Sequence, residues 1–289
     1  MAAPFGRNLE SCMRTIEQSI ASARARGAEL VVFPESALGG YVYEPHIPGT
    51  PLPVGAPPAL TSDSEVMAGL IRMAGDTVIC VGYTEEGSTG THSSAVCLSG
   101  DGILGHHRKV HLPPAEVGML EPGEGFAAFD TPLGRMGMLI CYDKVFPEAA
   151  RELALDGAEI IASLAAWPVS RRSPAARTRR DREVRHFDLL DEARALENQV
   201  VWVSANQTGR FGRLRFPGHA KVVDPDGRVL AATGARHGMA VAEVDISTAL
   251  GTARDDISHL GDRQPGTYLL GQEAIPSALT RRRRRPAAA

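Results

Sequence analysis

Short, continuous apolar runs recur along the sequence, and each is bounded by glycine, proline or polar residues. Apolar runs of about four to eight residues with such boundaries are typical of buried β-strands. Between the runs, apolar residues return at helical spacing, as Leu9, Met13, Ile16 and Ile20 do. Strands and helices are mixed without repeats, and no Gly/Ser-rich linker divides the chain, so we predict a single α/β domain. The clearest strand candidates are ELVVFPES, TVICVGY, SSAVCL, EIIASLAAW and VVWVSAN.

The same patterns predict the remaining elements. We expect helices over residues 8–26, 147–156 and 181–198. The helix over 147–156 has Pro147 in its first turn and Gly157 just past its end, and both residue types are common at these positions. Beyond about residue 250 the patterns assign little. Further strands are expected at 103–112, 135–141 and MAVAEVDI (239–246), with hairpin turns at 99–102 and 225–227.

Composition narrows the class of protein. Apolar residues make up 43% and charged residues 22% of the 289 residues, as in ordinary soluble domains. No apolar run reaches the roughly 18 residues that a membrane-spanning helix needs, and MAAPFGRNLE does not resemble a signal peptide. Cys12, Cys80, Cys97 and Cys141 are scattered without a CxxC pair. We therefore expect reduced thiols and a cytoplasmic location.

Arginines are concentrated in two stretches, residues 171–185 and the run 281–285. Such clusters are one signature of nucleic-acid binding. However, no aromatic residues interleave with the arginines, and the net charge of −3 becomes more negative once the run is set aside. We expect solvated segments and no nucleic-acid partner. Residues 271–289 are predicted to be a C-terminal extension that ends in a disordered arginine-rich tail.

Chemically reactive residues follow three of the predicted strands. In MGMLICYDKVFPEAAREL the apolar run stops at Cys141, and Pro147 then opens a helix. Glu35 lies just past the strand VVFP, and Lys109 lies near the end of GHHRKVHL. Strand ends are where α/β folds place their chemistry. A thiol, an ammonium and a carboxylate that converged there would form an acyl-transfer site, although spacing alone leaves their convergence open.

Other interpretations of reactive residues are weaker. Cys12, Cys80 and Cys97 lie inside apolar patterns and are expected to pack in the core. His106, His107 and His111 suggest a metal, but cysteine and carboxylate partners at ligand spacing are missing, so we interpret them as strand and site-wall residues. No GxSxG, HExxH, GxxxxGK[ST] or strand-turn-helix GxGxxG motif occurs. We expect neither a metal nor a cofactor.

Three segments resemble the signature blocks of the nitrilase (carbon–nitrogen hydrolase) superfamily: VVFPESALGGY, HRKVHLPPAE and LICYDKVFPEAARELALDGAEII. ENQVVWVSANQTG, GHAKVVDPDG and DRQPGTY resemble its later blocks, so the resemblance runs from about Phe5 to Tyr268. It implies one carbon–nitrogen hydrolase domain over residues 1–270, folded as a four-layer α-β-β-α sandwich. Two features depart from the pattern: MAAPFGR resembles only the end of the family's first strand, and Lys144 stands where relatives often have an apolar, aromatic or arginine residue.

The resemblance also implies a role for each residue. Glu35 would be the general base, and Cys141 would attack the substrate to form a thioester. Lys109 and a backbone N–H around Tyr142 would stabilise the oxyanion. Glu116, seven residues after Lys109, would pair with that lysine and orient the substrate. Two further aromatic residues, which packing alone would explain equally well, are candidate pocket walls: Tyr41 and Trp167.

The function implied is hydrolysis of a non-peptide C–N bond in a small-molecule amide, with release of ammonia. The alternatives are N-carbamoyl amide hydrolysis, which releases CO₂ as well as ammonia, and nitrile hydrolysis. A non-catalytic binding protein on the same fold is the alternative from a different class. The family also commonly forms homodimers by packing two sandwiches back to back, and we expect a homodimer or a higher oligomer here.

Overall fold

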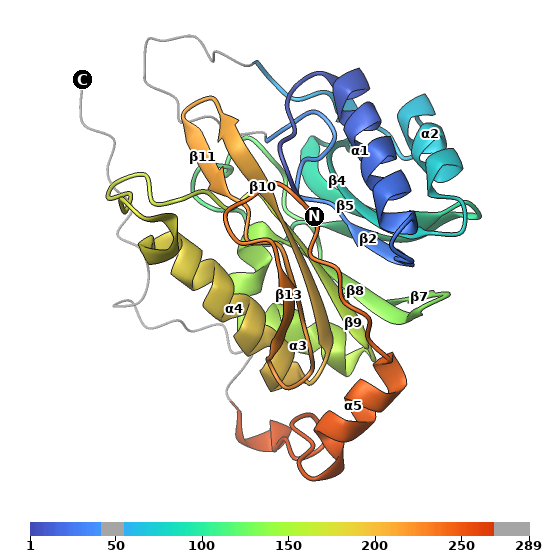
Figure 1. The fold of residues 1–289 in the computed structure, drawn as a ribbon, viewed down its shortest axis with the longest axis vertical. Helices are drawn as coiled ribbons and strands as arrows, with labels where there is room; N and C mark the ends of the chain where they lie inside the picture. The colour runs from blue at the N-terminus through green and yellow to red at the C-terminus, as the bar shows by residue number, and fades with distance from the viewer. Residues whose placement is uncertain (42–54, 269–289) are drawn as a thin grey trace.

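The computed structural model describes residues 1–41 and 55–268, and within them two β-sheets pack face to face between two pairs of helices (Figure 1). The predicted extension at 271–289 lies outside the described residues. The α-helices are α1 (Leu9–Arg24), α2 (Glu65–Ala74), α3 (Pro147–Leu155), α4 (Arg182–Asn198) and α5 (Ile246–Asp255), and the 3₁₀ helices are η1 (Cys141–Val145), η2 (Thr178–Arg180) and η3 (Pro265–Thr267).

One sheet has five strands, in the order β2-β4-β5-β6 with β3 paired to β4. The other has eight, in the order β13-β12-β10-β9-β8-β7, and both β1 and β11 pair with β10. The strands of the first sheet are β2 (Leu30–Val32), β3 (Ala59–Leu60), β4 (Val78–Glu86), β5 (Thr91–Ser99) and β6 (Gly102–Arg108). Those of the second are β1 (Ala2–Ala3), β7 (Phe129–Thr131), β8 (Gly134–Ile140), β9 (Ile160–Ala165), β10 (Val201–Phe211), β11 (Leu214–Pro217), β12 (Lys221–Val223) and β13 (Val229–Ala232).

The continuous apolar runs are explained by burial on both faces of each sheet. Successive side chains of a strand point to opposite faces. In β4, Ile79 packs toward α1 and α2, whereas Cys80 packs between the sheets. In β8, Leu139 packs toward α3 while Ile140 packs between the sheets. Each central strand therefore contributes to two apolar layers, which is the four-layer arrangement that we predicted (Figure 1).

Most of the predicted helices and strands are present within a few residues of the expected bounds. The prediction of a last strand over residues 239–246 is wrong: residues 239–245 pair with no strand among those described, and α5 begins at Ile246. The sequence analysis also missed α2 and α5. In α2, Ser64 caps the N-terminus by accepting from the backbone N–H of Met67, and Met67 and Leu70 are buried.

The topology brings several strand ends together. β8, β9 and β10 run parallel in one sheet, and β2 runs parallel to β4 in the other. Glu35 follows β2, Lys109 follows β6, Cys141 follows β8 and Ala166 follows β9. The candidate site lies at this shared edge. Among the described residues, no helix is long and apolar enough to cross a membrane.

Candidate active site

The carboxylate of Glu35 is held by contacts from both sheets. The side chain is only 1% exposed. Its Oε1 accepts hydrogen bonds from the Lys109 Nζ at 2.7 Å and the Ser93 Oγ at 3.3 Å, and its Oε2 accepts from the backbone N–H of Ala166 at 2.9 Å. Gly82 makes room for this loop, because a Cβ there would lie 2.8 Å from the Glu35 Cα. The carboxylate therefore has one fixed orientation.

Lys109 bridges two glutamates in the interior. Its Nζ lies 2.7 Å from the Glu35 Oε1 and 2.9 Å from both carboxylate oxygens of Glu116, and all three side chains are buried. Burial alone would lower the pKa of Lys109, but the charges of Glu116 and Glu35 outweigh it and raise that pKa well above the ordinary value. Lys109 is therefore a permanent positive charge in the site.

Glu116 is also bonded by Tyr41, whose hydroxyl donates to the Glu116 Oε1. Burial raises the pKa of Glu116, and the charge of Lys109 opposes that shift. Burial also raises the pKa of Tyr41, and the charge of Glu116 adds to the effect. The Tyr41 phenol is therefore a hydrogen-bond donor, and Tyr41 completes a buried chain of contacts that runs through Glu116 and Lys109 to Glu35.

Cys141 begins η1 directly after the last residue of β8. Its φ is +49°, a left-handed conformation that is uncommon outside glycine and often marks functional positions. Burial raises the pKa of the thiol, the charge of Glu35 raises it further and Lys109 opposes the shift. At neutral pH the resting thiol is therefore protonated and needs a base to become a nucleophile.

Asp143 anchors the turn that carries Cys141. Its Oδ2 accepts from the backbone N–H of Ile140 at 3.1 Å, and its Oδ1 accepts from the backbone N–H of His111 at 2.8 Å. The ring of His107 contacts Oδ2 and the ring of His111 contacts Oδ1, each at 3.0 Å. This carboxylate ties η1 to the segment after β6, and so fixes Cys141 relative to Lys109.

The other candidate residues surround this cluster. Trp167 is 9% exposed and belongs to the same apolar cluster as Cys141. The Trp167 Nε1–H is buried without a hydrogen-bond partner among the described residues. Tyr142 is half-buried, and its ring packs edge-on against the ring of Phe146, with 5.3 Å between the ring centres. The Tyr41 ring packs in the same way against the ring of Phe216, with 6.2 Å between the ring centres.

Comparison with known proteins identifies the family. A family model described as carbon–nitrogen hydrolase matches residues 2–254. The chain belongs to the carbon–nitrogen hydrolase family. This confirms the resemblance found in the three signature segments.

Curated relatives of this carbon–nitrogen hydrolase have nitrilase and amidase names. A nitrilase from Pyrococcus abyssi is 32% identical over 257 residues, which cover 87% of this chain and 90% of the relative. An (R)-stereoselective amidase from a Pseudomonas species is 32% identical over 241 residues, which cover 83% of this chain and 81% of the relative. An omega-amidase from Xenopus laevis is 28% identical over 284 residues, covering 92% of each. The chain is thus an amidase-like carbon–nitrogen hydrolase.

Solved structures confirm the fold. A carbon–nitrogen hydrolase from Helicobacter pylori G27 matches with a TM-score of 0.81 at 23% identity, covering 94% of this chain and 96% of that one. An amidase from Nesterenkonia sp. AN1, solved as a double mutant in complex with acrylamide, matches with a TM-score of 0.72 at 22% identity, covering 92% of each chain. The four-layer sandwich predicted for this carbon–nitrogen hydrolase is therefore correct.

Sequence reasoning missed several groups that hold the site together. Ser93 and the backbone N–H of Ala166 both bond Glu35, and no motif marks either of them. Asn206 fixes Trp167 by accepting from its backbone N–H at 2.8 Å. Asn206 lies in ENQVVWVSANQTG. The resemblance of that segment to a later family block was the one signal in the sequence that could have pointed to this residue.

Lys144, the residue that departs from the family pattern, is completely buried in the 3₁₀ helix that begins at Cys141. Its Nζ lies 2.7 Å from the Asp191 Oδ1 and 3.2 Å from the centre of the Phe187 ring. Burial lowers the pKa of Lys144 to about 8, although Asp191 opposes the shift. Lys221 also bonds Asp191, at 2.9 Å, so Lys144 belongs to a charged network between η1, α4 and β12.

The histidines near Lys109 have carboxylate partners. His107 and His111 both contact Asp143, and His106 contacts Glu85 at 2.9 Å. Among the residues that the structure describes, His, Cys, Asp and Glu side chains form no group of three or more that could hold a metal ion.

Proposed function

We propose that this carbon–nitrogen hydrolase cleaves a small-molecule amide through a thioester on Cys141. The observation that carries the proposal is the buried Lys109, bonded to Glu35 at 2.7 Å and to Glu116 at 2.9 Å beside the thiol of Cys141. One base, one fixed cation and one nucleophile at the same strand ends provide what acyl transfer needs.

In the acylation step, Glu35 removes the proton of the Cys141 thiol as the sulfur attacks the amide carbonyl carbon. Because burial and the charge of Glu35 keep the resting thiol protonated, proton removal must accompany attack. The carbonyl oxygen becomes an oxyanion, which the ammonium of Lys109 and a backbone N–H near Tyr142 stabilise. The C–N bond then breaks, Glu35 returns the proton to nitrogen, and ammonia leaves.

In the deacylation step, Glu35 acts as a base again. It takes a proton from a water molecule, and the resulting hydroxide attacks the thioester carbon. The C–S bond breaks, the carboxylic acid product forms, and the proton returns to the Cys141 sulfur. Because the Lys109 ammonium stays charged in both steps, it stabilises each oxyanion without supplying a proton.

The substrate class is inferred from the relatives and from the site walls. Two of the three relatives described above have amidase names, which favours amides over nitriles. We assign Tyr41 and Trp167 to the pocket wall because both are buried aromatics at the site, and Tyr41 contacts Glu116 directly. Glu116 would orient the substrate while it holds Lys109. The homodimer and the cytoplasmic location stay predictions.

An ammonia-release screen over small amides, ureido acids and nitriles tests this function. We expect ammonia without CO₂ from amides, and little from the other two classes. Cys141→Ala should lose more than nine-tenths of kcat while its circular dichroism and Tm stay close to wild type, because the substitution removes a single sulfur atom at the end of β8. Cys12→Ala removes another buried thiol, in α1, and should keep its turnover.

Two results would count against the proposal. If Cys141→Ala kept a tenth or more of the wild-type kcat, covalent catalysis by that residue would be wrong. If ureido acids or nitriles were the only compounds turned over, the mechanism could stand but the amide assignment would be replaced.

A further inference from the structure

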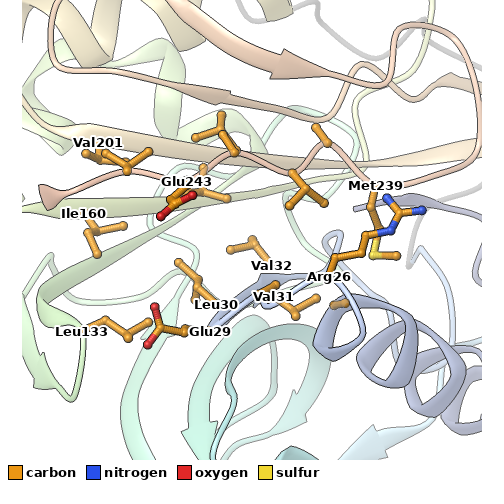
Figure 2. Close-up of a pocket in the computed structure, with 18 of the residues that line it drawn as sticks. Arg26, Glu29, Leu30, Val31, Val32, Leu133, Ile160, Val201, Met239 and Glu243 are labelled. Carbon is orange, nitrogen blue, oxygen red and sulfur yellow. The ribbon is translucent and has the colours of Figure 1, made fainter. Parts of the chain in front are cut away.

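Two thiols outside the candidate active site lie directly opposite each other in the five-stranded sheet. Cys80 of β4 and Cys97 of β5 are register partners in an antiparallel pair, and both are fully buried. They belong to the apolar layer between the two sheets. Figure 2 shows two other members of this layer, Val32 of β2, which lies beside Cys80, and Ile160 of the facing sheet. The mechanism proposed above uses neither thiol.

The backbone geometry at this pair suits a disulfide. Residues opposite each other in an antiparallel ladder alternate between hydrogen-bonded and non-hydrogen-bonded pairs. The carbonyl of Cys80 accepts from the backbone N–H of Phe33, next to β2, at 2.8 Å, and so it points away from β5. Cys80 and Cys97 therefore form a non-hydrogen-bonded pair, in which the Cα atoms lie about 4.5 Å apart. A disulfide spans Cα separations of about 4.4–6.8 Å.

The same face of these two strands supports Glu35. Side chains two or four residues apart on a strand share a face of the sheet. Two residues after Cys80, Gly82 leaves room for the Glu35 backbone, since a Cβ there would lie 2.8 Å from the Glu35 Cα. Four residues before Cys97, Ser93 donates to the Glu35 Oε1 at 3.3 Å. The thiol pair and two of the groups that position Glu35 therefore move together.

We propose that Cys80 and Cys97 are an oxidation site, at which hydrogen peroxide joins the two thiols in a disulfide that lowers turnover. One sulfur attacks a peroxide oxygen, the O–O bond breaks, and a sulfenic acid and one water molecule form. The second thiol attacks the sulfenic sulfur, the S–O bond breaks, and a second water molecule leaves. Overall, two thiols lose two electrons and two protons, and the peroxide is reduced to water.

The reaction is expected to be slow. The adjacent Cys97 thiol and burial raise the pKa of Cys80, so little of the reactive thiolate is present at neutral pH. Peroxide must also enter between the strands, which requires a local opening of the sheet. The pair therefore responds to sustained exposure to peroxide and is spared by a brief pulse.

A disulfide at this pair would move the strands that hold Glu35. Opposite Cβ atoms in a ladder lie about 4.5–5.5 Å apart, whereas a disulfide holds them about 3.8 Å apart. The strands must therefore approach each other by about 1 Å at the thiol pair, close to Gly82 and Ser93. A displacement of about 1 Å at a reacting group can cost about 10²-fold in rate. Part of the movement is absorbed before it reaches Glu35, so we expect a smaller loss.

The test is prolonged incubation with millimolar hydrogen peroxide, followed by peptide mapping without reduction. We expect two peptides joined through Cys80 and Cys97, lighter than the free peptides by the hydrogens lost. The same mapping counts the molecules in which Cys141 is still reduced. The kcat for ammonia release per reduced Cys141 should fall by about tenfold or more, and dithiothreitol should restore it. After the same treatment, Cys80→Ala and Cys97→Ala should each keep this kcat within about twofold of its value before treatment.

Two outcomes would overturn the proposal. The first is failure of Cys80 and Cys97 to join, whatever the state of Cys141. The second is a cross-linked protein whose kcat per reduced Cys141 equals that of the reduced protein, since the disulfide would then not affect the site. The mapping uses the unaltered chain and does not depend on turnover. If the proposed amide hydrolysis were absent, ammonia release would be missing before oxidation, and the mapping would still decide whether the disulfide forms.

Discussion

At the scale of single residues, the site depends on one ammonium group that two carboxylates share. Lys109 contacts Glu35 and Glu116, so two carboxylates surround one positive charge. The surplus negative charge, together with burial, keeps the Cys141 thiol protonated. Breaking a buried pair by removing one partner usually costs several kcal/mol, because the other charge is left uncompensated. The two glutamates should therefore be distinguishable by substitution.

The variant Glu116→Gln separates their roles. It removes a charge that holds Lys109 but leaves Glu35 available to deprotonate Cys141. We expect amide turnover to fall by about 10²-fold or more, while alkylation of Cys141 by iodoacetamide stays within about twofold of wild type. The exposed Glu124→Gln is a matched control and should change neither rate. Equal losses of alkylation and turnover would instead assign Glu116 a role in activating the thiol.

At the scale of elements, Asp143 joins the 3₁₀ helix η1 to the end of β6. Both of its oxygens accept backbone N–H groups, from Ile140 and from His111. Burial alone would raise the pKa of Asp143. These bonds and the rings of His107 and His111 outweigh that effect and hold the pKa well below its ordinary value. An asparagine offers only one acceptor oxygen, so one of the two N–H groups would face an amide nitrogen.

Asp143→Asn should therefore lower both stability and kcat, since Cys141 lies between Ile140 and Asp143. We expect a loss of about 1–3 kcal/mol in the free energy of unfolding at pH 7. Because the pKa is lowered on folding, the contribution of Asp143 is complete above the unfolded pKa of about 3.8 and is lost as pH falls through the folded value. Urea unfolding at several pH values should show the gap between the two proteins shrinking below about pH 4. A gap independent of pH would contradict this role.

At the scale of the whole molecule, the site is assembled where two sheets meet. Glu35 and Lys109 come from the five-stranded sheet, and Cys141 comes from the eight-stranded sheet. The relative position of Glu35 and Cys141 therefore depends on how the sheets pack. The family match ends at residue 254, and none of the site contacts described above involves a residue beyond it.

Deletion of residues 281–289 should consequently leave the chemistry intact. We expect kcat/KM to stay within about twofold of the full chain, a change of about 0.4 kcal/mol in transition-state stabilisation. Removal of five adjacent arginines should alter only solubility and weak, salt-screened attraction to polyanions. Steady-state kinetics at low and high salt measure this. A tenfold loss that persists at high salt would show that the tail reaches the site or an essential subunit contact.

The sequence by itself determined which reactive residues follow the predicted strands and the order in which they occur. The apolar runs predicted buried strands because a strand covered on both faces must be apolar throughout. The polar residue after each run, such as Glu35 or Cys141, could then be placed at the end of its strand. Local pattern sufficed for these assignments because strand burial and strand ends are properties of neighbouring residues.

Only the tertiary structure decided which of these strand ends meet. The backbone N–H of Ala166, which bonds Glu35, carries no side-chain signal, and Tyr41 reaches Glu116 across 75 positions of sequence. Residues 239–246 also show that a local pattern does not determine strand pairing. Their alternation predicts a strand, but a strand also requires a hydrogen-bonding neighbour, and none of the described strands lies in that position. Pairing is a relation between distant segments, so no local pattern can specify it.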